Sequence, residues 1–290
     1  MTRSLANLTL LFAAFIWGTA FVAQATAMQD IGPFLFTGLR FMLAVPAILP
    51  FAIREARRNP PIERRNRRLI VLNGAAFFLG TILQQIGIQF TSVTNAGFLT
   101  GIYVVLVPFA AWALFRSMPH RIVWPAAAIS LVGTFLLSGG GLVPLGLGDV
   151  LILAGSLFWA AQVALLGLLM ARTGRPVTVA VAQFAIGAVL SLAIAPLVEP
   201  IAIDRIAAAG VEILYAGLLS GGIAYTLQAI GQRWTPPADA AVILSSEAVF
   251  AAVAGALIMG DRLTAAGLVG AGLILAAILL VQLWPGRGRS

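Results

Sequence analysis

The stretch QQIGIQFTSVTNAG at residues 84–97 has a second copy, QAIGQRWTPPADAA, at residues 228–241. The copies are 144 residues apart and pair Gln84 with Gln228, Ile86 with Ile230, Gly87 with Gly231, Thr91 with Thr235 and Ala96 with Ala240. Two further matches have offsets of 141 and 142 residues: MPHR (118–121) with MGDR (259–262), and Trp17 in AAFIW with Trp159 in AGSLFW. Three matches in order at nearly one spacing predict that the chain contains two copies of one unit.

The composition indicates that both copies are embedded in a membrane. The chain of 290 residues is 60% hydrophobic and only 10% charged, whereas soluble domains are about 25% charged. A membrane-spanning helix needs about 20 mainly apolar residues. This rule predicts ten transmembrane helices, over residues 5–28, 33–53, 68–89, 95–115, 121–138, 148–170, 177–197, 209–230, 237–258 and 264–284. The expected fold is therefore that of an all-α integral membrane protein.

A repeat of five spans has a structural consequence. Because five is odd, the second copy must be inverted relative to the first in the membrane. We expect the first repeat at residues 1–144 and the second at 145–290, joined as one transport unit. Inverted repeats are typical of secondary transporters, which bind substrate near the bilayer midplane between the repeats.

The arginines indicate how the chain is oriented. Seven lie between the second and third spans, within residues 54–68. The loops expected on the same side also hold Arg3, Arg116, Arg121, Arg172, Arg175, Arg233, Arg287 and Arg289, against Arg205 and Arg262 on the other side. Basic residues collect on the cytoplasmic side. This bias predicts a multi-pass protein of the bacterial cytoplasmic (inner) membrane with both termini cytoplasmic.

The first span has an alternative interpretation as a secretory signal. It has a basic start and a small-residue end at Ala25-Thr26-Ala27. Its apolar stretch is longer than a signal core, and Trp17 has a partner in Trp159. We therefore expect the span to be retained.

Composition also excludes several kinds of function. The chain has no cysteine and no lysine, which excludes disulfides, thiol chemistry and a lysine-dependent phosphate loop. No cofactor and no metal are expected. The net charge of +8 does not indicate nucleic-acid binding, because membrane orientation explains the arginines.

Several motifs resemble one family of transporters. They are FIWGTAF (15–21), LRFMLA (39–44), the hairpins at 84–109 and 228–250, SEAVFAA (246–252) and GLVGAGLILAAILLV (267–281). Over essentially its whole length the chain resembles the drug/metabolite transporter superfamily, specifically its ten-helix EamA type. The resemblance implies export of amino acids or other metabolites, and the chain is similar to bacterial aromatic amino-acid exporters.

The chain departs from this family at one position. Members often have Glu-Pro in the ninth helix, whereas here Ala248 follows Glu247. This departure puts a kink there in doubt and makes Pro108 in the fourth helix the better candidate for a bend.

Polar and aromatic side chains within the spans are the candidates for a substrate site. Polar groups in hydrocarbon are costly unless they are paired, and several of these residues share helix faces with aromatic rings. Rings together with amides suit a ligand that has an apolar body and a few polar groups. The predicted substrate-binding residues are Trp17, Gln24, Gln84, Thr100, Tyr103, Trp159, Gln162, Tyr225, Gln228, Ser246 and Glu247. The alternatives are hydrogen bonds between helices for the amides, lipid contact or packing for the tryptophans, and bonds to the preceding turn for Ser245 and Ser246.

Two charges lie deep inside the predicted spans, Arg40 and Glu247. Intramembrane charges usually have a function. One hypothesis is that Glu247 receives a substrate ammonium group or a coupling proton. The other is that Arg40 and Glu247 compensate each other within the bundle.

Other conspicuous residues have structural interpretations. Gln85 stays undecided, and Gln89 is expected at a solvated helix end. Trp112, Trp124, Trp234 and Trp284 lie near span ends, as in an interfacial belt. Gly267, Gly270 and Gly272 suggest close helix packing. The stretch SGGGLVPLGLGD (138–149) is expected to link the two halves outside the membrane.

These observations favour a secondary transporter that exports amino acids, aromatic or hydrophobic ones first, or related small metabolites. It would work by alternating access, with the hairpins between helices 3 and 4 and between helices 8 and 9 rocking about the site, and a monomer is sufficient. A multidrug or other metabolite exporter of the same fold is the alternative. An intramembrane enzyme is more remote, because the single histidine, His120, lies in a loop. A channel is also more remote, because nothing in the sequence indicates a pore lined by repeated rings.

Overall fold

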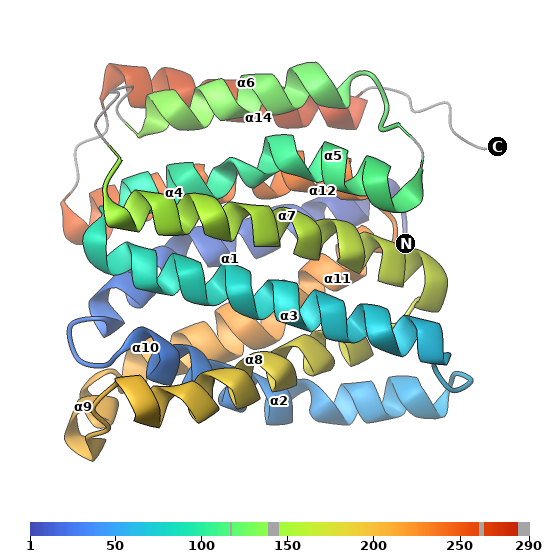
Figure 1. Ribbon diagram of the computed structural model, residues 1–290. Coiled ribbons are helices and arrows are strands. Elements are labelled where there is room, and N and C mark those ends of the chain that lie inside the picture. The colour runs from blue at the N-terminus through green and yellow to red at the C-terminus, as the bar shows by residue number, and fades with distance from the viewer. Residues whose placement is uncertain (117, 139–144, 261–263, 284–290) are drawn as a thin grey trace.

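Apolar helices of roughly membrane length run side by side through the molecule in the computed structural model (Figure 1). The structure describes residues 1–116, 118–138, 145–260 and 264–283, and these contain helices and no strand. The first five spans are α1 (Arg3–Ala27), α2 (Pro33–Arg57), α3 (Arg64–Gly87) with the 3₁₀ turn η1 (Ile88–Phe90), α4 (Val93–Gly101) with α5 (Tyr103–Phe115), and α6 (Val123–Leu137).

The next five spans follow the same pattern of whole and broken helices. They are α7 (Leu147–Thr173), α8 (Pro176–Val198), α10 (Gly210–Leu214) with the π-helix η2 (Tyr215–Tyr225) and α11 (Thr226–Gln232), α12 (Pro237–Leu244) with α13 (Glu247–Ala254) and the π-helix η3 (Gly255–Met259), and α14 (Ala265–Leu283). A short helix, α9 (Ile203–Ala208), lies in the connection between the seventh and eighth spans.

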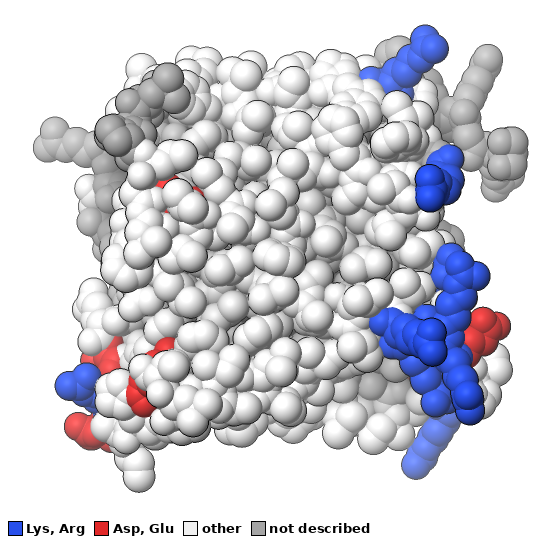
Figure 2. All heavy atoms as spheres, in the orientation of Figure 1, with Lys and Arg blue, Asp and Glu red and all other residues white. Residues whose placement is uncertain are grey.

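The length and surface of the bundle confirm a multi-pass membrane protein. Within the described residues, nine helical spans are long and apolar enough to cross a membrane, and α6 is a tenth, shorter apolar helix. Large apolar side chains cover the outside, such as Leu197, Leu257 and Val189, which are 80%, 81% and 66% exposed. Figure 2 shows a broad belt without charges, and arginines gathered at the end where α1 begins. Such a surface is stable when lipid covers it.

The arginine-rich end also holds the last described turn of α14, so both ends of the described chain lie there (Figure 1). Trp112 and Trp234 are 49% and 47% exposed, as expected of belt residues. The predictions for Arg262, Trp284, Arg287, Arg289 and the link at 139–144 fall outside the described residues.

Helices α2 and α8 lie against each other in opposite directions and cap each other. The carboxylate of Glu55, in the last turn of α2, accepts hydrogen bonds from the Val177 and Thr178 amides at 3.3 and 2.7 Å. The carboxylate of Glu199, just after α8, accepts from the Phe34 and Leu35 amides at 2.8 Å each. Each glutamate therefore satisfies amides that the first turn of the other helix leaves free.

Helices α6 and α14 form another close pair, through Gly133 and Gly270. A Cβ atom on Gly133 would lie 2.6 Å from the carbonyl oxygen of Gly270, so the two backbones touch. Gly267 makes only ordinary contacts. The packing prediction is wrong for Gly272, because nothing lies within 4 Å of a Cβ atom there.

Two spans are interrupted midway, at Ile102 and at Ser245–Ser246. The second break occurs without a proline. The hydroxyls of Ser245 and Ser246 donate back to the carbonyls of Val242 and Ile243 at 2.6 and 2.7 Å, which competes with the regular helical bonds. The ninth span is therefore interrupted directly before Glu247 although no proline follows that residue, so the absence of proline did not justify doubting a break there. In the fourth span the interruption lies at Ile102 and not at Pro108, which is inside α5.

Candidate functional site

A buried cavity in the middle of the bundle collects most of the predicted site residues. Nine of them line it: Trp17, Gln24, Gln84, Thr100, Tyr103, Trp159, Tyr225, Gln228 and Glu247. The lining also includes Phe21, Arg40, Val163, Ser220 and Leu244. The centre of a water-sized sphere can occupy about 40 Å³ of this space, which is room for about three water molecules. This space is too small for a ligand of the size of an amino acid.

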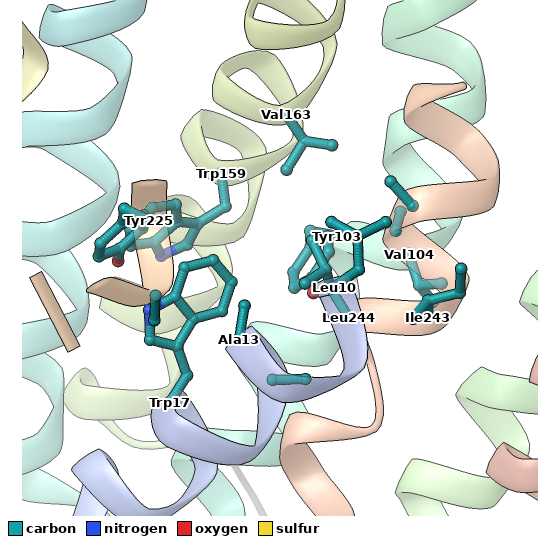
Figure 3. Packing of buried hydrophobic residues seen from close by; sticks show 14 of the residues in the cluster. Leu10, Ala13, Trp17, Tyr103, Val104, Trp159, Val163, Tyr225, Ile243 and Leu244 are labelled. Carbon is teal, nitrogen blue, oxygen red and sulfur yellow. The ribbon is translucent and has the colours of Figure 1, made fainter. Parts of the chain in front are cut away.

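Aromatic rings form one wall of the cavity (Figure 3). The ring centroids of Trp17 and Tyr225 are 4.5 Å apart. Trp159 stacks on Tyr225 with the ring centroids 6.0 Å apart and 12° between the planes. Phe77 supports Tyr225 edge-on at 4.9 Å. These rings come from α1, α3, α7 and η2, so the wall depends on the packing of both halves of the chain.

Gln84 is a hydrogen-bonding residue beside this aromatic wall. Its side-chain oxygen accepts a hydrogen bond from Trp159 Nε1 at 2.9 Å and one from the Thr100 hydroxyl at 3.4 Å. Its amide nitrogen makes no hydrogen bond to the described residues. Gln84 therefore joins two helices and still has donors available to a ligand.

A chain of amides extends from Gln228 away from the cavity. Gln228 and Gln162 exchange hydrogen bonds at 3.4 and 3.5 Å. Gln183 Oε1 accepts from Gln162 at 3.3 Å and from Asn73 at 3.0 Å. Gln162 thus lies behind the cavity lining and not in it. Sequence reasoning missed Asn73 and Gln183, although both are amides within apolar spans and carry the same signal as Gln84.

The remaining polar predictions divide between packing and solvent. Gln85 is fully buried and donates to the Gln24 carbonyl at 3.2 Å, so it joins α3 to α1. Gln89 is exposed at the helix end, as predicted. Ser246 does not line the cavity, because its hydroxyl is used by the break in the ninth span.

Trp17 is held in place by an irregular helix. Its Nε1 donates to the Ser220 carbonyl at 3.2 Å, inside the π-helix η2. Wide turns of this kind are frequent at functional sites. Sequence reasoning could not identify this contact, because Ser220 contributes its backbone carbonyl.

Arg40 and Glu247 both line the cavity and are 4% and 5% exposed. No ion pair joins these two side chains within the described residues. The hypothesis that they compensate each other directly is therefore not supported.

A larger hollow lies at the arginine-rich end, between α5, α7 and α12. Its lining includes Phe115, Gly167, Gln232, Trp234 and Ala238, and water-sized spheres can be centred in about 670 Å³ of it. The two cavities approach each other at Val163. This residue lines the central cavity, and its carbonyl accepts from Gln232 of the hollow at 2.9 Å.

Polar contacts join helices at each end of the bundle. At the arginine-rich end, Arg3 pairs with Asp239 at 2.6 Å and Thr235 donates to Asn7 at 2.9 Å. We call this set, which joins α1 to the start of α12, the arginine-end latch.

The opposite end has a corresponding set of contacts. Asp149, in the first turn of α7, accepts from Thr91 at 2.8 Å and from Asn95 at 2.7 Å. We call this set the far-end latch. Each latch thus ties the tip of one hairpin to the first turn of a helix from the other half of the chain.

Comparison with known proteins places this arrangement in a family. The sequence model of the EamA-like transporter family matches residues 4–139 and 146–283. The chain belongs to the EamA-like transporter family. It is a membrane transporter with the EamA fold, and the superfamily resemblance seen in its sequence is confirmed.

Relatives of this EamA-like chain extend over its whole length. An uncharacterized transporter of Archaeoglobus fulgidus is 31% identical over 97% of the chain and 87% of its own length. The uncharacterized transporter YwfM of Bacillus subtilis is 26% identical over 100% of the chain and 98% of its own length. An S-adenosylmethionine/S-adenosylhomocysteine transporter of Chlamydia muridarum is 28% identical over 44% of the chain and 41% of its own length. The crystal structure of a protein with 18% sequence identity to this chain superimposes on it over the full length of both chains, with a TM-score of 0.80. This likeness supports the fold alone.

Proposed function

We propose that this EamA-like protein is a secondary transporter of the cytoplasmic membrane that exports amino acids, with aromatic and hydrophobic ones as its best substrates. The observation that carries the proposal is the central cavity, where Trp17, Trp159 and Tyr225 form an apolar wall beside the amides of Gln84 and Gln228. Stacked rings beside a few polar groups suit a ligand with an aromatic body and a polar end.

The transport unit consists, in this proposal, of two inverted repeats at residues 1–144 and 145–290. The separate matches of the family model to residues 4–139 and 146–283 support this division. The mutual caps of α2 and α8 support the inversion, because Glu55 and Glu199 are 144 residues apart and make equivalent contacts in opposite directions.

Alternating access would use the two latches. Thr235 and Asp239 of the arginine-end latch lie 144 residues after Thr91 and Asn95 of the far-end latch. Rocking of one hairpin would open its latch while the other stays closed, so the cavity would face one side at a time. The hollow at the arginine-rich end would be the cytoplasmic intake, since basic residues mark the cytoplasmic side.

Export of a different metabolite by the same mechanism is the second candidate. The chlamydial relatives named as S-adenosylmethionine/S-adenosylhomocysteine transporters favour including that ligand in any test. S-adenosylmethionine also has an amino-acid end, so both candidates would use the same polar part of the cavity.

Proteoliposomes test the proposal. The purified protein is challenged with labelled phenylalanine and tryptophan beside alanine, threonine, S-adenosylmethionine and a cationic dye. We expect uptake of the aromatic amino acids, accelerated by the same amino acid inside the vesicle, because a carrier exchanges substrates and a channel does not. Protein-free liposomes provide the background. Absence of amino-acid transport would refute the amino-acid assignment, and transport without trans-stimulation would refute alternating access.

A further inference from the structure

The central cavity contains a buried guanidinium group that lacks a hydrogen-bonding partner. Arg40 is 4% exposed, and its Nε has no acceptor within the described residues. Its contacts are to rings: the guanidinium carbon lies 5.0 Å from the centroid of Phe36 and 4.9 Å from that of Phe41. Ring faces attract a cation but do not accept the directed hydrogen bonds of its N–H groups as a carboxylate does.

The same cavity contains a buried carboxylate that is also incompletely satisfied. Glu247 is 5% exposed, and its Oε1 has no donor within the described residues. The Tyr103 hydroxyl interacts with this carboxylate. Tyr225, Glu247 and Arg40 all line this cavity, so the two charges belong to one polar environment beside the aromatic wall.

Two opposite charges that are buried without an ion pair require an explanation. Burying a charge without a partner is costly, and each of these residues could have been neutral if it only filled space. We propose that Arg40 binds the carboxylate and Glu247 the ammonium group of one zwitterionic substrate, whose apolar body packs against Trp17, Trp159 and Tyr225. This inference rests on the proposed function and adds which residues recognise each end of the amino acid.

The charge balance favours a zwitterion over a simple cation or anion. When both side chains are ionised, Arg40 and Glu247 together carry no net charge, so a neutral ligand with both groups pairs each of them and leaves the cavity neutral. An amine alone would leave the guanidinium unpaired, and a carboxylic acid alone would leave Glu247 unpaired. A site with unpaired buried groups discriminates strongly against such truncated ligands.

Three related probes separate the two recognition events. Phenylalanine has both charged groups, 2-phenylethylamine lacks the carboxylate, and 3-phenylpropionate lacks the ammonium group. Binding to the purified wild-type protein in detergent is measured by calorimetry. We expect phenylalanine to bind at least about tenfold more tightly than either analogue, because each analogue leaves one buried charge unpaired.

Two variants assign the ends. In Arg40→Gln we expect phenylalanine to bind no more tightly than 2-phenylethylamine, because the partner of the carboxylate is gone. The variant should still bind phenylalanine more tightly than 3-phenylpropionate. In Glu247→Gln we expect the opposite pattern. Arg54→Gln, at the exposed end of the same helix, and Glu63→Gln, on the exposed loop before α3, are matched controls that should keep both preferences. Size-exclusion elution identifies any variant that fails to fold, and Arg40→Lys, which keeps the charge, should restore part of the lost preference.

The outcomes distinguish this inference from the proposed function. If wild-type protein transports phenylalanine but binds the three probes alike, the recognition by Arg40 and Glu247 is wrong and the transport function stands. The same conclusion follows if the folded Arg40→Gln protein keeps the preference of the wild type. If phenylalanine is neither bound nor transported, both the inference and the amino-acid assignment are wrong.

Discussion

Gln84 shows how one side chain can serve both the fold and the site. Its oxygen accepts from Trp159 and Thr100, and its amide nitrogen remains available in the cavity. Replacing it by leucine would leave the indole N–H of Trp159 without an acceptor. We expect Gln84→Leu to weaken substrate affinity about tenfold, because an unpaired buried donor costs about 1–3 kcal/mol. The KM for uptake into proteoliposomes measures the effect.

Gln89→Leu is the matched control, because Gln89 belongs to the same segment and is exposed at the end of the span. It should leave the KM within about twofold of the wild type, as expected of a surface substitution. Equal effects of the two substitutions would mean that Gln84 has no special role in binding.

At this scale the sequence predicted the cavity lining well where polarity gave a signal. Trp17, Gln84 and Glu247 were conspicuous because polar or indole groups are rare in the middle of apolar spans. Phe21 and Val163 gave no signal, because an apolar side chain in an apolar helix looks the same whether it faces lipid, core or cavity. Gln162 lies behind the lining, where Gln183 and Gln228 occupy its side chain, and its position on the helix face could not reveal these partners.

At the scale of helices, the caps between α2 and α8 should stabilise the packed bundle. Glu55→Ala and Glu199→Ala each remove the acceptor for two backbone amides. We expect each substitution to lower the free energy of unfolding by about 1–2 kcal/mol, as is typical for loss of a helix cap. Thermal unfolding in detergent, followed by tryptophan fluorescence, measures this change.

Glu63→Ala provides the comparison, because Glu63 precedes α3 without making a side-chain cap. It should unfold at the wild-type temperature. If the three alanine variants unfold alike, the caps contribute nothing measurable.

Hydropathy predicted the spans at this scale because their length and apolar content are set by the bilayer. It could not predict where they break. The interruption at Ser245–Ser246 depends on hydroxyls that bond back to the chain, and serines in other helices do this without breaking them. The caps from Glu55 and Glu199 were missed because they join residues more than 120 positions apart.

For the whole molecule, alternating access predicts that each latch must open during the cycle. The native chain has no cysteine, so cysteine pairs can be introduced without further changes. Asn7→Cys with Thr235→Cys would join the arginine-end latch, and Thr91→Cys with Asp149→Cys the far-end latch. We expect a short bis-methanethiosulfonate cross-linker, which forms a disulfide with each cysteine, to stop transport by either double variant. A reductant cleaves these disulfides and should restore transport, measured as uptake into proteoliposomes.

The four single-cysteine variants are the controls, and the cross-linker should leave their transport unchanged. Continued transport by a fully cross-linked double variant would show that its latch does not need to open.

The orientation of the whole molecule can be tested in the same background. Asn59 and Gln89 are both exposed, and they lie at opposite ends of the bundle because Asn59 precedes α3 and Gln89 follows it. We expect a membrane-impermeant maleimide to label Gln89→Cys and not Asn59→Cys in intact cells, because we propose that the arginine-rich end faces the cytoplasm. Both variants should react after the cells are permeabilised, and the reverse pattern in intact cells would invert the topology.

The two caps of α2 and α8 also bear on how such a chain could arise. In the proposed inverted repeats, Glu55 and Glu199 occupy equivalent positions. Their two contacts are related in the same way as the two copies of a contact in a twofold symmetric dimer. One ancestral glutamate in a five-helix subunit would have stabilised both sides of an antiparallel dimer at once. Gene duplication and fusion would then preserve the contact while freeing its two copies to diverge. Such divergence would account for the difference between Asn95 in the first proposed repeat and Asp239 at the equivalent position of the second.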